Sequence, residues 1–185
     1  MKLLKSAPPI HPLEKLYHFP LELEEGDRSG LYIRVEPHGG QAWSGFFVQG
    51  FDSDLAVNMM CSCPDPGTLC AVVGGYAYVV KAADPAAWLR IEQKPVTAVR
   101  VVEEHRLILF AGFTTITALG SSGIKWTTER LSWDGISLGE ILSGKLYGKG
   151  WDAMANQEVS FEVDLESGQH SGGARPQSGS ARPAK

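Results

Sequence analysis

The sequence predicts an all-β protein built from antiparallel meanders, and three observations support this fold class. Short apolar runs, rich in β-branched and aromatic residues, recur between residues 31 and 165. Turn-forming residues separate them, and the 185-residue chain contains 21 glycines and 11 prolines. Long charged runs of helical periodicity are absent from the sequence. We therefore expect a sandwich, a barrel or a partial propeller-like array of sheets, with at most one or two short helical turns.

The expected strands up to residue 128 are apolar or alternating segments bounded by turn residues. Gly30 and Pro37 enclose the first of them, and Gly74-Gly75 forms a hairpin-type pair between two others. In chain order these strands are residues 31–35, 44–51, 69–73, 76–80, 96–102, 107–110, 114–119 and 124–128.

Two further hairpins are expected in the last third of the chain. Asp134-Gly135 separates residues 131–133 from 136–138, and Ser143-Gly144 separates 140–142 from 145–147. The last expected strand, 159–165, alternates cleanly and places four apolar residues on one face: Val159, Phe161, Val163 and Leu165. Because only a polar tail follows, we expect this strand to be the C-terminal edge of its sheet, with that face in the core.

Two short segments have local features of a helix. In residues 84–89, Asp84 is a suitable N-cap and Pro85 occupies the first helical position. Residues 13–17 are a weaker candidate. Glu103, Glu104 and His105 are expected to form a charged turn between two buried strands rather than an acid–base site.

The chain divides into three parts. Residues 1–16 contain Pro8, Pro9 and Pro12 and are expected to form an extended arm. Residues 17–167 are expected to form a single β-rich domain. Residues 168–185 lack large apolar side chains and are expected to be a disordered tail, removable from about Gly172 onward without loss of folding.

Charge and hydropathy restrict the partners and the location. The net charge of −4 divides into +2 for residues 1–16, −8 for 17–165 and +2 for 166–185. An acidic centre disfavours nucleic-acid binding, which needs clustered basic residues. No run approaches the roughly 18 apolar residues of a membrane helix, and the apolar start of the chain is too short for a signal peptide. We therefore expect a cytoplasmic protein without nucleic-acid or membrane partners.

A short motif of the form apolar-x-x-Gly-aromatic occurs three times, ending at Phe51, Tyr76 and Phe113. With these motifs, residues 45–165 resemble the blade-type meanders of β-propellers. The segment 107–133 also resembles small uncharacterised bacterial all-β proteins, through Gly123-Ile-Lys-Trp126 and Leu131-Ser-Trp-Asp-Gly135. This resemblance implies no activity. Two or three blades cannot close a ring, so association of several copies is one way to complete the fold.

The cysteines are concentrated in one segment. Cys61, Cys63 and Cys70 follow a C-x-C spacing with a third thiol seven residues later, whereas closed zinc sites use C-x2-C pairs and four ligands. We expect buried structural thiols that form no disulfide in a reducing compartment, with metal binding or redox pairing as weaker interpretations. We expect no cofactor.

Aromatic residues near the C-terminus are the best candidates for a binding site. Trp126, Trp133, Tyr147 and Trp151 are interleaved with lysines. Exposed tryptophans can stack on ligands and dominate protein interfaces. The alternative is that these side chains fill the core.

The function predicted from the sequence is a non-catalytic β-rich module for binding or assembly, with a protein partner or a second copy of the chain. This prediction depends on the aromatic cluster and on the absence of a recognisable catalytic motif. A first alternative is a hydrolase for carbohydrate-like substrates that uses acidic residues near Trp126, Trp133 and Trp151, such as Asp134 and Asp152. A second alternative is a metal-binding protein with cysteine ligands.

Overall fold

The computed structural model describes residues 2–4, 14–20, 29–62 and 64–174. The described residues form sixteen strands in four sheets of four strands each, and the one helical element is a short 3-10 turn, Glu103–His105. This arrangement confirms the predicted all-β fold class, and it is not a closed barrel.

The first two sheets contain residues from the N-terminal half of the chain. Sheet A has the order β1-β3-β4-β2, and β2 runs parallel to β4. Sheet B is an antiparallel meander in the order β5-β6-β7-β8. The strands are β1 (Lys2–Leu4), β2 (Lys15–Phe19), β3 (Gly30–Val35), β4 (Trp43–Val48), β5 (Met59–Ser62), β6 (Thr68–Val73), β7 (Tyr76–Lys81) and β8 (Asp84–Arg90).

The other two sheets are both antiparallel meanders. Sheet C contains β9 to β12 and sheet D contains β13 to β16, each in chain order. The strands are β9 (Ala98–Val102), β10 (Leu107–Ala111), β11 (Ile116–Gly120), β12 (Gly123–Thr127), β13 (Ile136–Leu142), β14 (Lys145–Asp152), β15 (Gln157–Asp164) and β16 (His170–Gly172).

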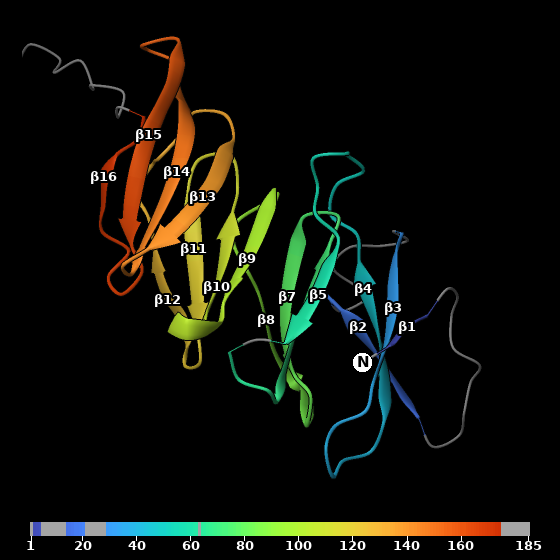
Figure 1. The fold of residues 1–185 in the computed structure, drawn as a ribbon. Coiled ribbons are helices and arrows are strands. Elements are labelled where there is room, and N and C mark those ends of the chain that lie inside the picture. The colour runs from blue at the N-terminus through green and yellow to red at the C-terminus, as the bar shows by residue number, and fades with distance from the viewer. Residues whose placement is uncertain (1, 5–13, 21–28, 63, 175–185) are drawn as a thin grey trace, which may run out of the picture.

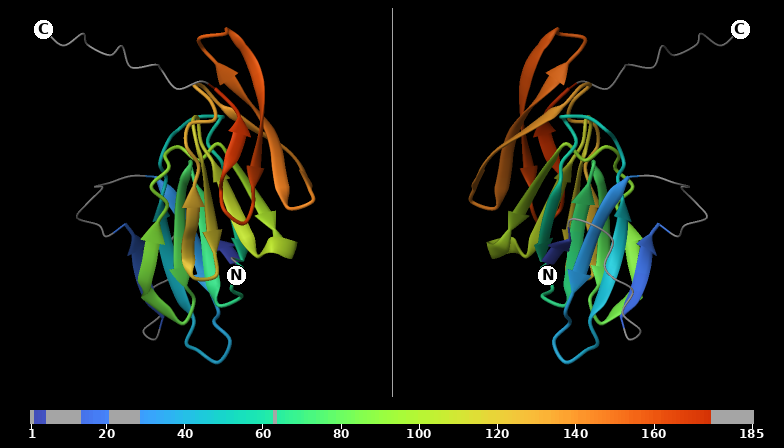
Figure 2. Two further views of the ribbon diagram at one scale, coloured as in Figure 1. Left: turned by 90° about the vertical axis from the view of Figure 1, so that its left-hand side faces the viewer. Right: turned by 90° about the vertical axis from the view of Figure 1, so that its right-hand side faces the viewer.

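The four sheets stack face to face in chain order (Figure 1, Figure 2). Each interface is a separate core layer. Phe47 and Tyr78 belong to the layer between sheets A and B, and Phe110 belongs to the layer between B and C. Phe161 and Trp126 belong to the layer between C and D. The two middle sheets are therefore covered on both faces, as their nearly continuous apolar strands require.

The segments that connect the sheets meet at one end of the stack, at the top of Figure 1. Each connection is hydrogen-bonded to the central hairpin turn of a sheet that it joins. Gly50 donates to Val73 O at 3.1 Å, Val96 donates to Gly75 O at 2.8 Å, and Leu131 donates to Thr114 O at 2.8 Å. We call this the linker end; it comprises residues 49–58, 91–97 and 128–135 with the adjoining hairpin turns.

Gly75 shows why this end needs glycine. Its φ of +77° lies in the left-handed region, and a Cβ there would be 2.9 Å from the Cβ of Pro95. Gly75 is the glycine of the apolar-x-x-Gly-aromatic motif that ends at Tyr76. It therefore allows the connecting segment to pass directly over the hairpin turn.

Most strands predicted from periodicity are present, but the helix prediction for residues 84–89 is wrong. These residues belong to β8, where Trp88 pairs with Val80 and packs edge-on against Phe19 at a ring distance of 5.5 Å. Pro85 is tolerated because β8 is an edge strand of sheet B. The weaker helix candidate, 13–17, overlaps β2; Leu13 lies outside the described residues. The predicted charged turn at Glu103–His105 is confirmed.

The predicted hairpin at Asp134-Gly135 is also wrong. Residues 131–133 form part of the connection between sheets C and D rather than a strand. Gly135 has a φ of +86°, as the sequence suggested, but the turn leads from the connection into β13. The hairpin at Ser143-Gly144 is confirmed.

Both ends of the chain contain a paired strand where the structure describes them. Residues 2–4 of the expected arm form β1, which pairs with β3, whereas residues 5–13 lie outside the described part. Residues 168–174 of the expected tail are ordered: β16 pairs with β15, and Ala174 is buried and donates to Leu131 O at 2.9 Å. Residues 175–185 lie outside the described part. Strand β16, not the segment 159–165, is therefore the edge of sheet D.

The predicted alternation of β15 is confirmed. Phe161, Val163 and Leu165 are buried in the layer between sheets C and D, and Val159 on the same face is half-buried. Ser160 is exposed on the opposite face. The register of β14 with β15 places Phe161 directly opposite Gly148.

Asp164 orders the turn that leads from β15 into β16. Its carboxylate accepts hydrogen bonds from the Ser167 hydroxyl and the Ser167 N–H, both at 2.8 Å, and from the Glu166 N–H at 3.1 Å. These bonds, with that of the Ser167 side chain the strongest cause, hold the pKa of Asp164 below its ordinary value of 3.8.

The lowered pKa of Asp164 makes the stability of sheet D depend on pH in the acidic range. The carboxylate stabilises the folded state above its ordinary pKa, and this contribution is lost as the pH falls through the folded-state pKa. We expect urea midpoints of Asp164→Asn to fall less steeply than those of the parent between about pH 4 and pH 2. Ser167→Ala should give an intermediate slope. A slope for Asp164→Asn equal to that of the parent would contradict this assignment.

Candidate functional site

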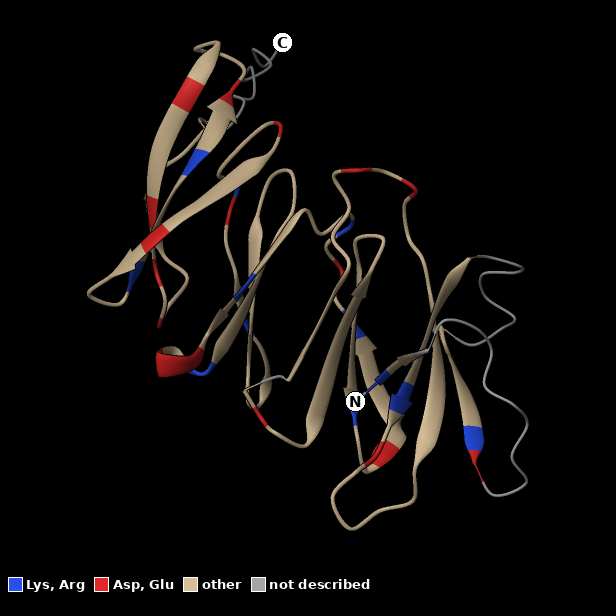
Figure 3. Cartoon of the chain, turned by 45° about the vertical axis from the view of Figure 1, so that its right-hand side comes forward, with Lys and Arg blue, Asp and Glu red and all other residues tan. Residues whose placement is uncertain are grey.

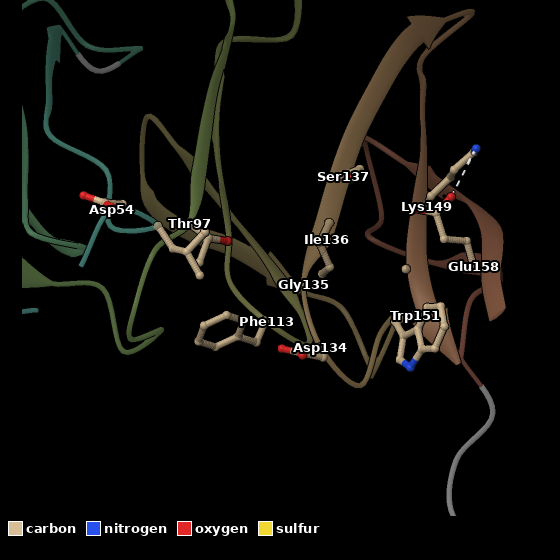
Figure 4. A pocket seen from close by; sticks show the side chains of 12 residues that line it. Asp54, Thr97, Phe113, Asp134, Gly135, Ile136, Ser137, Lys149, Trp151 and Glu158 are labelled. Atoms are coloured by element: carbon tan, nitrogen blue, oxygen red, sulfur yellow. Dashed lines mark hydrogen bonds and ion pairs between the residues drawn. The ribbon is translucent and has the colours of Figure 1, made fainter. Parts of the chain in front are cut away.

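An open groove of about 680 Å³ lies at the linker end, between the connections and sheet D (Figure 4). It is assembled from segments that are far apart in the chain: the loop before β5, the end of the connection before β9, the β10–β11 turn, the connection before β13, and strands β13, β14 and β15. Its volume is in the range of small-molecule and cofactor pockets, which is roughly 300–1,000 Å³. The lining residues are Asp54, Leu55, Thr97, Phe113, Asp134, Gly135, Ile136, Ser137, Lys149, Gly150, Trp151 and Glu158.

Two aromatic side chains line the groove. Phe113 lies in the β10–β11 turn, where its carbonyl accepts a hydrogen bond from the Gly135 N–H at 3.0 Å. Trp151 lies on β14 and is 36% exposed, because the strand turns Gly150 and Asp152 inward and Trp151 outward. Figure 4 shows Phe113 beside Asp134 and Trp151 across from them on β14.

The polar lining contains three carboxylates and one ammonium group. Lys149 Nζ is 3.4 Å from Glu158 Oε2, an exposed ion pair between β14 and β15 (Figure 4). Within the described part of the chain, the carboxylates of Asp54 and Asp134 have no ion pair and no hydrogen bond. These two acidic groups are therefore available to a ligand.

Large apolar side chains are exposed around this groove. Leu55 is 64% exposed and lines it, as does Trp151. Phe51, in the loop before β5, and Met154, in the β14–β15 turn, are also exposed at this end. Charged residues of both signs are distributed over the sheets (Figure 3). The other exposed large apolar residues are spread over several strands: Leu3, Leu16, Met60, Ile124, Leu142 and Tyr147. Apolar side chains gathered at one place on a surface are typical of an interaction site.

The structure separates the four aromatic residues that the sequence grouped together. Trp126 is a core residue: it is 8% exposed in the layer between sheets C and D, and its Nε1 donates to Leu165 O at 3.0 Å. Tyr147 is exposed on the same face of β14 as Trp151 but does not line the groove.

Trp133 lies in the connection before β13 and is half-buried. The Arg130 guanidinium covers its ring at 4.5 Å from the centroid. The backbone N–H of Trp133 donates to Trp151 O at 2.8 Å. Trp133 therefore supports the strand that carries Trp151, and only Trp151 of the four candidates lines the groove.

The acidic pair considered from the sequence is also divided. Asp134 lines the groove, whereas Asp152 is 1% exposed and accepts hydrogen bonds from the Met154 and Ala155 N–H groups in the β14–β15 turn. Sequence reasoning missed Asp54, Phe113 and Glu158 as lining residues. The Gly-aromatic motif marked Phe113 as a turn residue, but no spacing in the sequence links it to Trp151.

The cysteine segment contributes no metal site to the part of the chain that the structure describes. Cys61 and Cys70 lie opposite each other on β5 and β6, and Cys63 lies outside the described residues. No group of three or more His, Cys, Asp or Glu side chains among the described residues could hold a metal ion. In the same residues, no helix combines the length and the apolar character needed to cross a membrane.

Comparisons of the chain with known protein families, with curated proteins and with solved structures found no significant match.

Proposed function

We propose that the chain is a non-catalytic binding module that engages a segment of a partner protein through the groove at its linker end. The observation that supports this proposal is the exposure of Trp151 and Leu55 in a groove that also contains two carboxylates without partners, Asp54 and Asp134. Tryptophan and other large apolar residues dominate the energetics of protein interfaces.

The chemistry of the lining favours a ligand with both apolar and donor groups. Trp151, Phe113 and Leu55 offer apolar surface, and the free carboxylates can only accept hydrogen bonds when ionised. A peptide segment with an apolar side chain next to a lysine or arginine supplies both. Met154 and Phe51 are further exposed apolar side chains at the linker end that a protein partner could contact.

The lining residues also support a binding role over a catalytic one. The hydroxyl of Thr97 donates to Ala111 O at 3.3 Å, and Glu158 is paired with Lys149. Among the described lining residues, no hydroxyl is hydrogen-bonded to a base, which is the arrangement that activates a nucleophile.

Trp151→Ala is expected to weaken peptide binding without unfolding the protein. The probes are peptides selected by phage display against the immobilised parent chain. We expect Trp151→Ala to lower the affinity of the selected peptides about tenfold or more, as measured by calorimetry. Asp134→Asn should weaken those peptides that carry a basic residue.

Tyr147→Ala is the matched control for this experiment. Tyr147 is an exposed aromatic residue on the same face of the same strand but outside the groove, so its removal should leave the affinity unchanged. Peptides that bind Trp151→Ala as tightly as the parent, or that lose affinity only with Tyr147→Ala, would refute the assignment of the groove.

The three carboxylates of the groove favour a second candidate function, a hydrolase for carbohydrate-like substrates. Glycoside hydrolysis uses two carboxyl groups on either side of the scissile bond, and Asp54, Asp134 and Glu158 line one cavity that also contains a tryptophan. This candidate requires release of reducing sugar from soluble xylan or β-glucan by the parent and its loss in Asp134→Asn. A parent without such activity would exclude the candidate for these substrates.

A further inference from the structure

The register of sheet B places two thiols directly opposite each other. Cys61 on β5 pairs with Cys70 on β6 in an antiparallel arrangement, between the pairs Met60–Ala71 and Ser62–Leu69. Both cysteines belong to the apolar layer that faces sheet C, so their side chains are on the same face of sheet B.

Directly opposed residues in antiparallel strands meet the distance requirement of a disulfide. Their Cα atoms are about 4.5 or 5.5 Å apart, depending on the type of pair. A disulfide spans Cα distances of about 4.4–6.8 Å. The backbone of β5 and β6 therefore already holds these two residues at a distance that the bond can span.

The two thiols differ in access. Cys70 is fully buried, whereas Cys61 is half-buried on β5, an edge strand of sheet B. A hydrogen bond from Cys70 to the Cys61 sulfur holds the pKa of the Cys61 thiol below its ordinary value, although burial acts in the opposite direction. Cys61 is thus the more accessible of the two sulfurs, and the hydrogen bond from Cys70 favours its thiolate form.

We propose that Cys61 and Cys70 form a reversible cross-strand disulfide by exchange with a small-molecule disulfide such as oxidised glutathione. The Cys61 thiolate attacks one glutathione sulfur and releases one reduced glutathione, which leaves a mixed disulfide on Cys61. Cys70 loses its proton to solvent, attacks the Cys61 sulfur and releases the second reduced glutathione. Two protein thiols are oxidised, and one glutathione disulfide is reduced to two thiols.

The disulfide would restrain β5, the strand that directly follows a loop lining the groove. Strand β5 has four residues and directly follows the loop that contains Asp54 and Leu55. A covalent link from β5 to the central strand β6 would restrict local opening of this edge. The proposal is independent of the ligand of the groove, because its test measures the state of the sulfur atoms.

The test uses Cys63→Ser, which removes the competing thiol and leaves only the proposed pair. The folded variant is equilibrated with oxidised and reduced glutathione and quenched with acid, and its intact mass is measured. We expect a loss of two hydrogen atoms without retained glutathione. Cleavage before Asp65 places Cys61 and Cys70 in separate peptides, which should remain linked until reduction.

The same equilibration in urea distinguishes native geometry from sequence proximity. At one glutathione ratio, the ratio of disulfide to dithiol should be at least about tenfold higher in the folded protein than in the unfolded chain. An equal or lower ratio in the folded protein, or a stable mixed disulfide on Cys61, would overturn the proposal. The second variant adds Cys61→Ser to Cys63→Ser. In this variant, Cys70 should not form a disulfide under the same conditions.

Discussion

Replacement of Phe161 by alanine is expected to lower the free energy of unfolding by about 3–5 kcal/mol. Phe161 is 3% exposed and lies in the layer between sheets C and D. Its ring covers Gly148 on the neighbouring strand, where a Cβ would be 2.7 Å from the ring atom Cε2. Removal of the ring therefore leaves a cavity that β14 cannot fill, because Gly148 has no side chain.

The control for this prediction is Tyr147→Ala. Tyr147 is an aromatic residue on the adjacent strand whose side chain is 39% exposed on the opposite face of sheet D. Its replacement should change the free energy of unfolding by at most about 1 kcal/mol. Urea titration at equilibrium gives both values. A stable Phe161→Ala protein, or an equal loss in both variants, would show that the inward face of β15 does not contribute the core contacts described.

Trp126→Ala is expected to destabilise the protein by a similar amount, about 3–5 kcal/mol. The indole is buried between sheets C and D, and Gly168 packs against it: a Cβ on Gly168 would be 2.6 Å from the ring. The ring also donates a hydrogen bond from Nε1 to Leu165 O. The variant therefore loses both the apolar contacts and the donor that anchors the end of β15.

Trp126→Phe separates these two contributions. Phenylalanine retains most of the apolar surface but leaves Leu165 O without its donor, which costs about 1–3 kcal/mol. Trp151→Ala is the matched control, since it removes an exposed indole, and it should cost at most about 1 kcal/mol. If Trp126→Ala unfolds no more easily than Trp151→Ala, the placement of Trp126 in the core is wrong.

The strands that the sequence predicted well are those in which the alternation of apolar and polar side chains determines which face is buried. The alternation in β15 is one case, because Phe161 and Val163 can be buried together only if the strand has a period of two residues. The error in β8 has a tertiary cause. Asp84 and Pro85 favour the start of a helix locally. Trp88 gains more as part of a strand, from its contacts with Phe19 across the layer between sheets A and B and with Tyr78 on the neighbouring strand β7.

The tail and the groove could not be predicted for other reasons. Strand β16 is held by backbone pairing with β15, and this pairing requires no large side chain. The groove combines Asp54, Phe113 and Trp151, which come together only through the stacking of separate sheets. The sequence therefore identified Trp151 as a candidate but not the residues around it.

The stacking of the sheets in chain order also determines how cooperatively the protein unfolds. Each core layer joins only two consecutive sheets, so the stability of the fold is a sum of nearest-neighbour terms rather than the property of one shared centre. Sheets A and D each contribute to one layer and can open without exposing the layer between B and C. Protection of backbone amides against exchange should therefore be greatest in β6, β7 and β10 and decrease toward both ends of the stack.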